Sequence, residues 1–206
     1  MDVRVAFVGQ EGSASNRSVR IYRVSADVNR YQYLLASDAN WRIHRGNLQF
    51  DGSSIDEWNP PEVFSYKPKH RAGDIWGFEM ISSALVVSPE ATRRLEGFLA
   101  MAGQILPLPF EGRMFSLFNV TECINCLDQD KTEWEYGETT GKPIRIVSYA
   151  FHKDRMSESS IFKIPETANG EILCYDGARD PEDEFKPYVE SHGITGLEFT
   201  EIWSSQ

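Results

Sequence analysis

Long hydrophobic runs are missing from this sequence of 206 residues. A membrane-spanning helix needs about 20 mostly apolar residues in a row, and no segment approaches that length. Residues 1–8 also lack the apolar stretch of a secretory signal peptide, so we expect a cytoplasmic protein. The three cysteines are few and odd in number, which argues against the disulfide framework of a secreted domain.

The sequence motifs of common enzyme active sites are also missing. Segment 9–16 contains glycine but lacks the Gly-Lys-Ser/Thr ending of a phosphate-binding loop and the Gly-x-Gly-x-x-Gly spacing. The four histidines form no His-Glu-x-x-His pair, and no serine lies in a Gly-x-Ser-x-Gly turn. We therefore expect a protein that is not an enzyme, with no catalytic residues and no cofactor.

One Cys-x-x-Cys pair, Cys123 and Cys126, is the remaining candidate for metal or redox chemistry. A zinc site needs about four ligands, so even with Cys174 a fourth would have to be assumed among nearby carboxylates or His152. The pair lies in the run 114–127, which we predict to contain strand, where residues i and i+3 point to opposite faces. We predict reduced, metal-free cysteines.

Basic residues are outnumbered by acidic ones, 21 to 31, which gives a formal net charge of −10. Such a protein is repelled by nucleic-acid phosphates and by anionic membranes, so we expect neither as a partner. A basic protein is the partner that suits this charge. The alternative interpretation is that the charge serves solubility alone.

One order of predicted elements occurs twice in the sequence. In each copy a short aromatic strand and a second strand precede a helix, a glycine and a third strand. The copies span residues 72–110 and 158–200. Further strands are predicted at residues 3–8, 19–24, 31–35 and 144–151. We expect an α+β fold with a mixed, mostly antiparallel sheet or sheets, a few short helices and two similar strand–helix–strand units.

Helix signals are clearest at residues 89–102. Ser88 fits the N-cap, a proline follows at the first helical position, and apolar side chains recur along one face. Gly103 is placed to end this helix. The second helix, expected within residues 181–191, contains Pro187, which removes a backbone hydrogen bond. We therefore expect that helix to be short or bent.

Two acidic segments are candidate partner-binding surfaces. The first places a tryptophan and a tyrosine among carboxylates and consists of Glu133, Trp134, Glu135 and Tyr136. The alternative face consists of Asp180, Glu182, Asp183 and Glu184. An exposed tryptophan ringed by carboxylates has the composition of an interaction hot spot. Ordinary solvated surface is the competing interpretation of both segments, and carboxylate catalysis is the least favoured.

Several short motifs resemble a bacterial protein family. They lie at residues 72–76, 85–88, 119–121, 126–128 and 161–164, and the ending His-Gly-Ile-Thr-Gly-Leu-Glu-Phe at 192–199 matches best. From Tyr31 to the C-terminus the chain resembles immunity family eleven of polymorphic and contact-dependent toxin systems, formerly a domain of unknown function. The resemblance implies a cytosolic protein that binds and silences a cognate toxin, with no catalytic residues.

The domain organisation follows from this resemblance. Residues 1–30 fall outside it as N-terminal strands or a hairpin, and residues 31–206 form one immunity-like domain. Two sub-halves near residues 1–112 and 113–206 are the alternative. The leading functional hypothesis is a toxin antidote that acts by occlusion. The competing hypotheses are a carboxylate-dependent hydrolase or other enzyme, and an adaptor of a secretion-system cluster.

Overall fold

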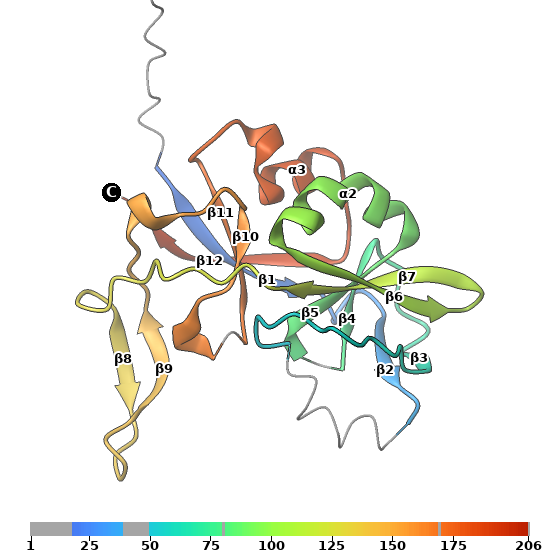
Figure 1. The fold of residues 1–206 in the computed structure, drawn as a ribbon, viewed down its shortest axis with the longest axis horizontal. Helices are drawn as coiled ribbons and strands as arrows, with labels where there is room; N and C mark the ends of the chain where they lie inside the picture. Colours follow the sequence, from blue (N-terminus) through green and yellow to red (C-terminus); the bar gives the residue numbers. More distant parts are fainter. Residues whose placement is uncertain (1–17, 39–49, 80, 169, 206) are drawn as a thin grey trace, which may run out of the picture.

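The computed structural model describes residues 18–38, 50–79, 81–168 and 170–205, and most of its strands form two sheets (Figure 1). The six-stranded sheet has the order β3-β2-β4-β5-β7-β6 and the four-stranded sheet the order β10-β11-β1-β12. Strands β8 and β9 form a separate two-stranded sheet. Among the named strand pairs of the described residues, β2 and β4 are parallel and the others antiparallel. The predicted α+β class is confirmed.

The strand boundaries are as follows. The six-stranded sheet contains β2 (Tyr33–Ala36), β3 (Val63–Tyr66), β4 (Ile75–Phe78), β5 (Ile81–Val87), β6 (Gly103–Phe110) and β7 (Arg113–Val120). The four-stranded sheet contains β1 (Arg20–Ala26), β10 (Ile161–Phe162), β11 (Ile172–Asp176) and β12 (Leu197–Ser204). The two-stranded sheet contains β8 (Glu133–Tyr136) and β9 (Pro143–Ser148).

Helix α2 (Pro89–Ala102) has the predicted boundaries, because its end signals are local. The Ser88 hydroxyl accepts a hydrogen bond from the Ala91 amide at 3.2 Å, as an N-cap should. Gly103 follows the helix at once and begins β6 in extended conformation. A Cβ there would lie 2.0 Å from the Asn119 carbonyl oxygen, so the close approach of β7 requires glycine. Within the described residues no helix has the length and apolar composition to cross a bilayer.

Helix α3 (Phe185–Ser191) is short, as predicted. The 3₁₀ turn η4 (Pro181–Asp183) and an extended Glu184 precede it. Pro187 therefore falls in the first turn of α3, where its missing amide hydrogen would have no intrahelical acceptor. Two further 3₁₀ turns are η2 (Lys153–Arg155) and η3 (Pro165–Thr167).

The two predicted units are present and exchange a strand. The order β4-β5-α2-β6 of the first unit is repeated as β10-β11-α3-β12 in the second. In the first sheet β7 lies between β5 and β6, and in the second β1 lies between β11 and β12. Strand β7 precedes the second unit in the chain and β1 precedes the first. Each sheet therefore takes an inner strand from the other half of the molecule.

Three hydrophobic clusters join the sheets and the helices. The central cluster combines α2 and α3 with residues of both sheets, including Val24, Leu85, Leu95, Phe118 and Phe185. A second cluster contains Trp76, Phe110 and Phe115 of the six-stranded sheet, with Phe50. A third, called the outer cluster below, joins residues of the four-stranded sheet to Cys126, Leu127 and Phe151. Both helices thus pack against one core to which both sheets contribute.

Some predicted strands have different limits. The strand predicted within residues 114–127 ends at Val120, and residues 121–128 form only isolated bridges at Cys123 and Leu127. The strand predicted at 19–24 is β1. The strand predicted at 3–8 lies outside the described residues.

Candidate functional site: a projecting hairpin and its groove

The β8–β9 hairpin projects from the rest of the molecule, at the lower left of Figure 1. Its strands pair Trp134 with Ile146 and Glu135 with Arg145, and the last pair is also joined by a salt bridge. Three apolar side chains of the hairpin are largely exposed: Tyr136 at 56%, Ile144 at 65% and Val147 at 60%. Exposed apolar groups on a projecting element are typical of interaction surfaces.

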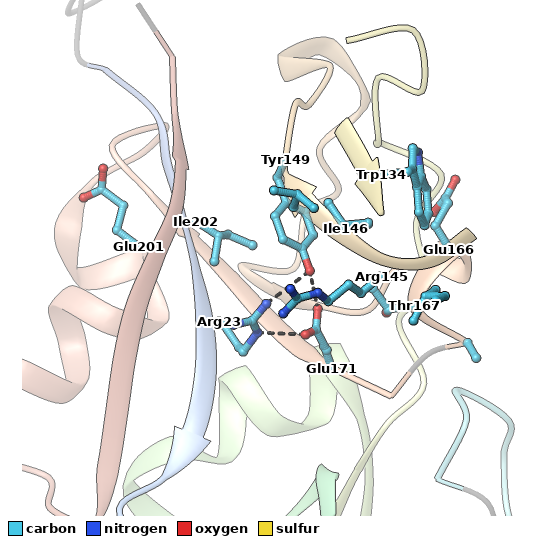
Figure 2. Close-up of a pocket in the computed structure, with 13 residues that line it drawn as sticks. Arg23, Trp134, Arg145, Ile146, Tyr149, Glu166, Thr167, Glu171, Glu201 and Ile202 are labelled. Carbon is cyan, nitrogen blue, oxygen red and sulfur yellow. Dashed lines mark hydrogen bonds and ion pairs between the residues drawn. The ribbon is translucent and has the colours of Figure 1, made fainter. Parts of the chain in front are cut away.

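A groove of about 830 Å³ lies along this hairpin (Figure 2). One wall consists of Trp134 and the β9 residues 144–147. Other parts of its lining come from residues 166–168 in and after η3 and from Glu201 and Ile202 of β12. The groove therefore combines apolar side chains with three carboxylates and two arginines.

Arg23, Tyr149 and Glu171 meet in the groove and point toward one another in Figure 2. The Arg23 guanidinium lies 2.8 Å from a Glu171 carboxylate oxygen and donates to the Tyr149 hydroxyl at 3.2 Å. That hydroxyl donates to the other Glu171 oxygen at 2.7 Å. Burial, reinforced by Glu171, raises the pKa of Tyr149 to about 12. The phenol therefore stays protonated near neutral pH and fastens the base of the hairpin to β1.

The first candidate segment, residues 133–136, is strand β8 itself. Glu133, Glu135 and Tyr136 are exposed, as expected for a binding surface. Trp134 is only partly exposed, because it packs against the outer cluster while also lining the groove. It is therefore a wall of the groove and not its most exposed anchor.

The second candidate segment lies elsewhere in the molecule, around η4 and α3 at the top of Figure 1. Asp180, Glu182 and Asp183 are exposed, and the last two line a smaller groove of about 330 Å³ beside α2. Glu184 is only 1% exposed, in contrast to the acidic face expected for it. Its carboxylate accepts hydrogen bonds from the amides of three consecutive residues, Gly177, Ala178 and Arg179, at 2.7–2.8 Å.

The groove also contains residues that were not predicted to form a site. Ile144 and Val147 belong to a segment whose β-branched content indicated a strand, and such strands are usually half-buried. Arg23 and Glu171 lie 148 positions apart in the sequence and carried no motif. No local signal could have identified either pair.

The cysteines do not form a site with the nearby acids. Cys123 is exposed, whereas Cys126 and Cys174 are buried. Burial raises the pKa of Cys126 to about 12 and also raises that of Cys123, which disfavours the reactive thiolate. Within the described residues, no group of three or more His, Cys, Asp or Glu side chains could hold a metal ion.

Lys163 is a buried cation with no sequence motif to mark it. Its side chain is 0% exposed, and its ammonium donates to the carbonyl oxygens of Phe50 at 2.6 Å and Ser83 at 2.9 Å. Burial lowers the pKa of Lys163 to about 8, against the opposing effects of Asp51 and Cys123. The residue links the second half of the chain to the first.

Comparison with known proteins identifies the family. No curated protein matches the chain. The immunity protein family (Imm11) matches residues 14–204, so the match begins before Tyr31 and includes β1. Because the match covers nearly the whole chain, this protein belongs to the immunity protein family Imm11.

Proposed function

We propose that this protein binds a cognate protein toxin in the cytoplasm of the producing cell and neutralises it by covering its active site or substrate surface. Family membership is the observation that carries this proposal. The projecting hairpin supports it, because exposed Tyr136, Ile144 and Val147 offer apolar contact area beside carboxylates. The net charge of −10 suits a basic toxin, since opposite charges accelerate encounter and favour the correct partner.

The groove is better suited to binding than to acid–base chemistry. Its partly exposed ion pair, Arg23 with Glu171, also contacts the Tyr149 hydroxyl. These contacts position the hairpin. The proposed neutralisation therefore depends on physical occlusion of the toxin.

Co-expression with a toxin encoded by a gene adjacent to that of this protein tests the proposal. The protein should restore growth of cells that produce the toxin, and the two should copurify. Trp134→Ala should weaken binding by about 2 kcal/mol, because it removes an aromatic wall of the groove. Isothermal titration calorimetry measures this change.

The control for that experiment is Trp58→Ala. Trp58 is also partly buried and packs against the second cluster, away from the hairpin, so its loss should leave toxin affinity within about twofold. Rescue of growth without any physical association would contradict occlusion. Full affinity of Trp134→Ala would contradict only the assignment of the site.

A further inference from the structure

The antiparallel strand pairs at equivalent places in the two halves of the molecule pair differently with their neighbours. The pair β2 and β3 follows β1 and precedes β4, just as the β8–β9 hairpin follows β7 and precedes β10. In the first half, β2 also pairs with β4, so β2 and β3 extend the six-stranded sheet. In the second half, the segment after β7 occupies the corresponding edge: the Ile124 amide donates to the Lys163 carbonyl, and the Lys163 amide donates to that of Glu122.

The β8–β9 hairpin is therefore not part of the four-stranded sheet. Within the described part of the chain, β8 and β9 pair only with each other. Each strand of a two-stranded sheet has one edge whose backbone amides and carbonyls point away from its partner. Natural proteins usually cover or interrupt such an edge, since it accepts another strand readily.

The free edge of β9 borders the groove. All four consecutive residues from Ile144 to Val147 line it. The β9 backbone borders the groove together with its side chains, and two register shifts against β8 leave Ile144 and Val147 without a directly paired residue on β8. The groove thus offers both backbone pairing groups and space beside them.

The chemistry around this edge defines what would fit. Exposed Ile144 and Val147 call for apolar side chains. Glu166 and Glu201 also line the groove. One carboxylate oxygen of Glu166 accepts from the Gln129 amide at 3.0 Å, and the other is buried with no hydrogen-bond partner among the described residues. A carboxylate oxygen without a hydrogen-bond partner favours contact with a cationic donor.

We infer that the β9 edge receives an extended segment of the toxin, which adds as a third strand to the β8–β9 sheet. The inference rests on the proposed function. The segment carries apolar residues, which contact Ile144 and Val147, and a Lys or Arg residue, which meets Glu166. Backbone pairing supplies affinity in this mode, and the side chains supply specificity.

A second copy of this protein fits the edge less well. Each copy carries a net charge of −10, so two copies repel each other as they approach. A basic segment of another protein removes that repulsion.

Hydrogen–deuterium exchange on the full chain, with and without the purified toxic domain encoded by the adjacent gene, tests strand addition. Outward-facing amides within residues 143–148 should exchange at least tenfold more slowly in the complex. Amides of β6, another edge strand, should not change. A complex that forms without protection of β9 would overturn the inference while leaving the proposed function intact.

Matched substitutions provide a second measurement. Val147→Lys should weaken toxin binding at least tenfold, because it places a cation against a basic segment. Met114→Lys changes a residue of similar exposure, 55%, on β7 and should alter affinity less than twofold. Glu166→Gln should also weaken binding, at least threefold. Equal affinities for Val147→Lys and Met114→Lys would overturn the inference.

The remaining outcomes are also decisive. If the toxic domain neither binds the protein nor is neutralised in cells, both the proposed function and the inference fail. If sedimentation without toxin shows a dimer in which the β9 amides are already protected, the occupant of the edge is a second copy, and the inference is wrong. Overlapping 12-residue peptides of the toxic domain should locate the segment, with binding confined to peptides that contain both apolar and basic residues.

Discussion

At the scale of residues, the buried charged side chains decide local structure. Glu184 holds the loop between β11 and α3 by accepting from three consecutive backbone amides. Buried amides without acceptors cost about 1–3 kcal/mol each, so a single carboxylate can stabilise an irregular loop. This residue belongs to an acidic segment, but its role is internal.

Replacing Glu184 by Ala should lower the free energy of unfolding by about 2 kcal/mol or more, because the three amides lose their acceptor. Urea denaturation measures the loss. Glu182→Ala, at an exposed neighbour, is the matched control and should change stability by less than about 0.5 kcal/mol. Similar values for the two variants would show that the Glu184 contacts contribute little.

Lys163 should make stability depend on pH in the alkaline range. Its pKa is lowered from 10.5 to about 8 in the folded protein, so the folded state loses its proton before the unfolded state does. The contribution of Lys163 to the free energy of unfolding therefore rises as the pH increases from about 8 to about 10.5. Below that range the cost of burying the charged ammonium is fully present.

Lys163→Met removes this dependence. Urea denaturation at several pH values should show wild type gaining stability relative to the variant between pH 8 and pH 10.5. The difference between the two proteins is the readout, because other titrating groups contribute equally to both. A difference that does not change with pH would contradict the lowered pKa of Lys163.

At the scale of elements, the β8–β9 hairpin contributes few residues to the hydrophobic core. The chain enters and leaves the hairpin at adjacent points, since the Ala150 amide donates to the Thr132 hydroxyl at 3.3 Å. Trp134 and Ile146 pack against the outer cluster. The hairpin is thus anchored at its base while its strands extend into solvent.

Replacing residues 133–148 with a short Gly-Ser linker should abolish toxin binding but keep a cooperative unfolding transition. The loss of Trp134 and Ile146 should lower the free energy of unfolding by about 3 kcal/mol. Calorimetry gives both results. As a control, replacing only the turn, residues 137–142, by Asn-Gly should preserve binding, because both strands remain. Retained affinity after removal of the whole hairpin would place the binding surface elsewhere.

At the scale of the whole molecule, strand exchange makes the two halves depend on each other. Strand β1 pairs with β11 and β12, which belong to the far end of the chain. Strand β7 likewise separates β5 from β6. Without its inner strand, each sheet would expose unpaired edges and part of the central cluster.

Dividing the chain in the β6–β7 turn, between Glu111 and Gly112, should therefore give two fragments that do not fold alone. Mixed or co-expressed, residues 1–111 and 112–206 should form a one-to-one complex with the circular dichroism spectrum of the intact protein. Size-exclusion chromatography with denaturation of each sample checks this. A monomeric fragment that unfolds cooperatively by itself would contradict the mutual dependence.

The elements with local signals could be predicted from the sequence. Ser88, the apolar face of residues 89–102 and Gly103 define α2, and Pro187 limits α3. Burial of charged residues could not be predicted, because loop carboxylates and lysines are usually solvated. The groove could not be predicted either, since β-branched residues indicate a strand but not whether another element will cover that strand.

The sequence by itself determined the element types, the repeated order of strands and helices, and the motifs that indicate the immunity family. These depend on residues close together in the chain. Only the tertiary structure decided that β1 and β7 each lie in the sheet of the other half, that Glu184 faces inward and that, among the described strands, β9 pairs with β8 alone. Backbone hydrogen bonding is nearly the same for any pair of strands, so partners are selected by the long-range fit of buried side chains.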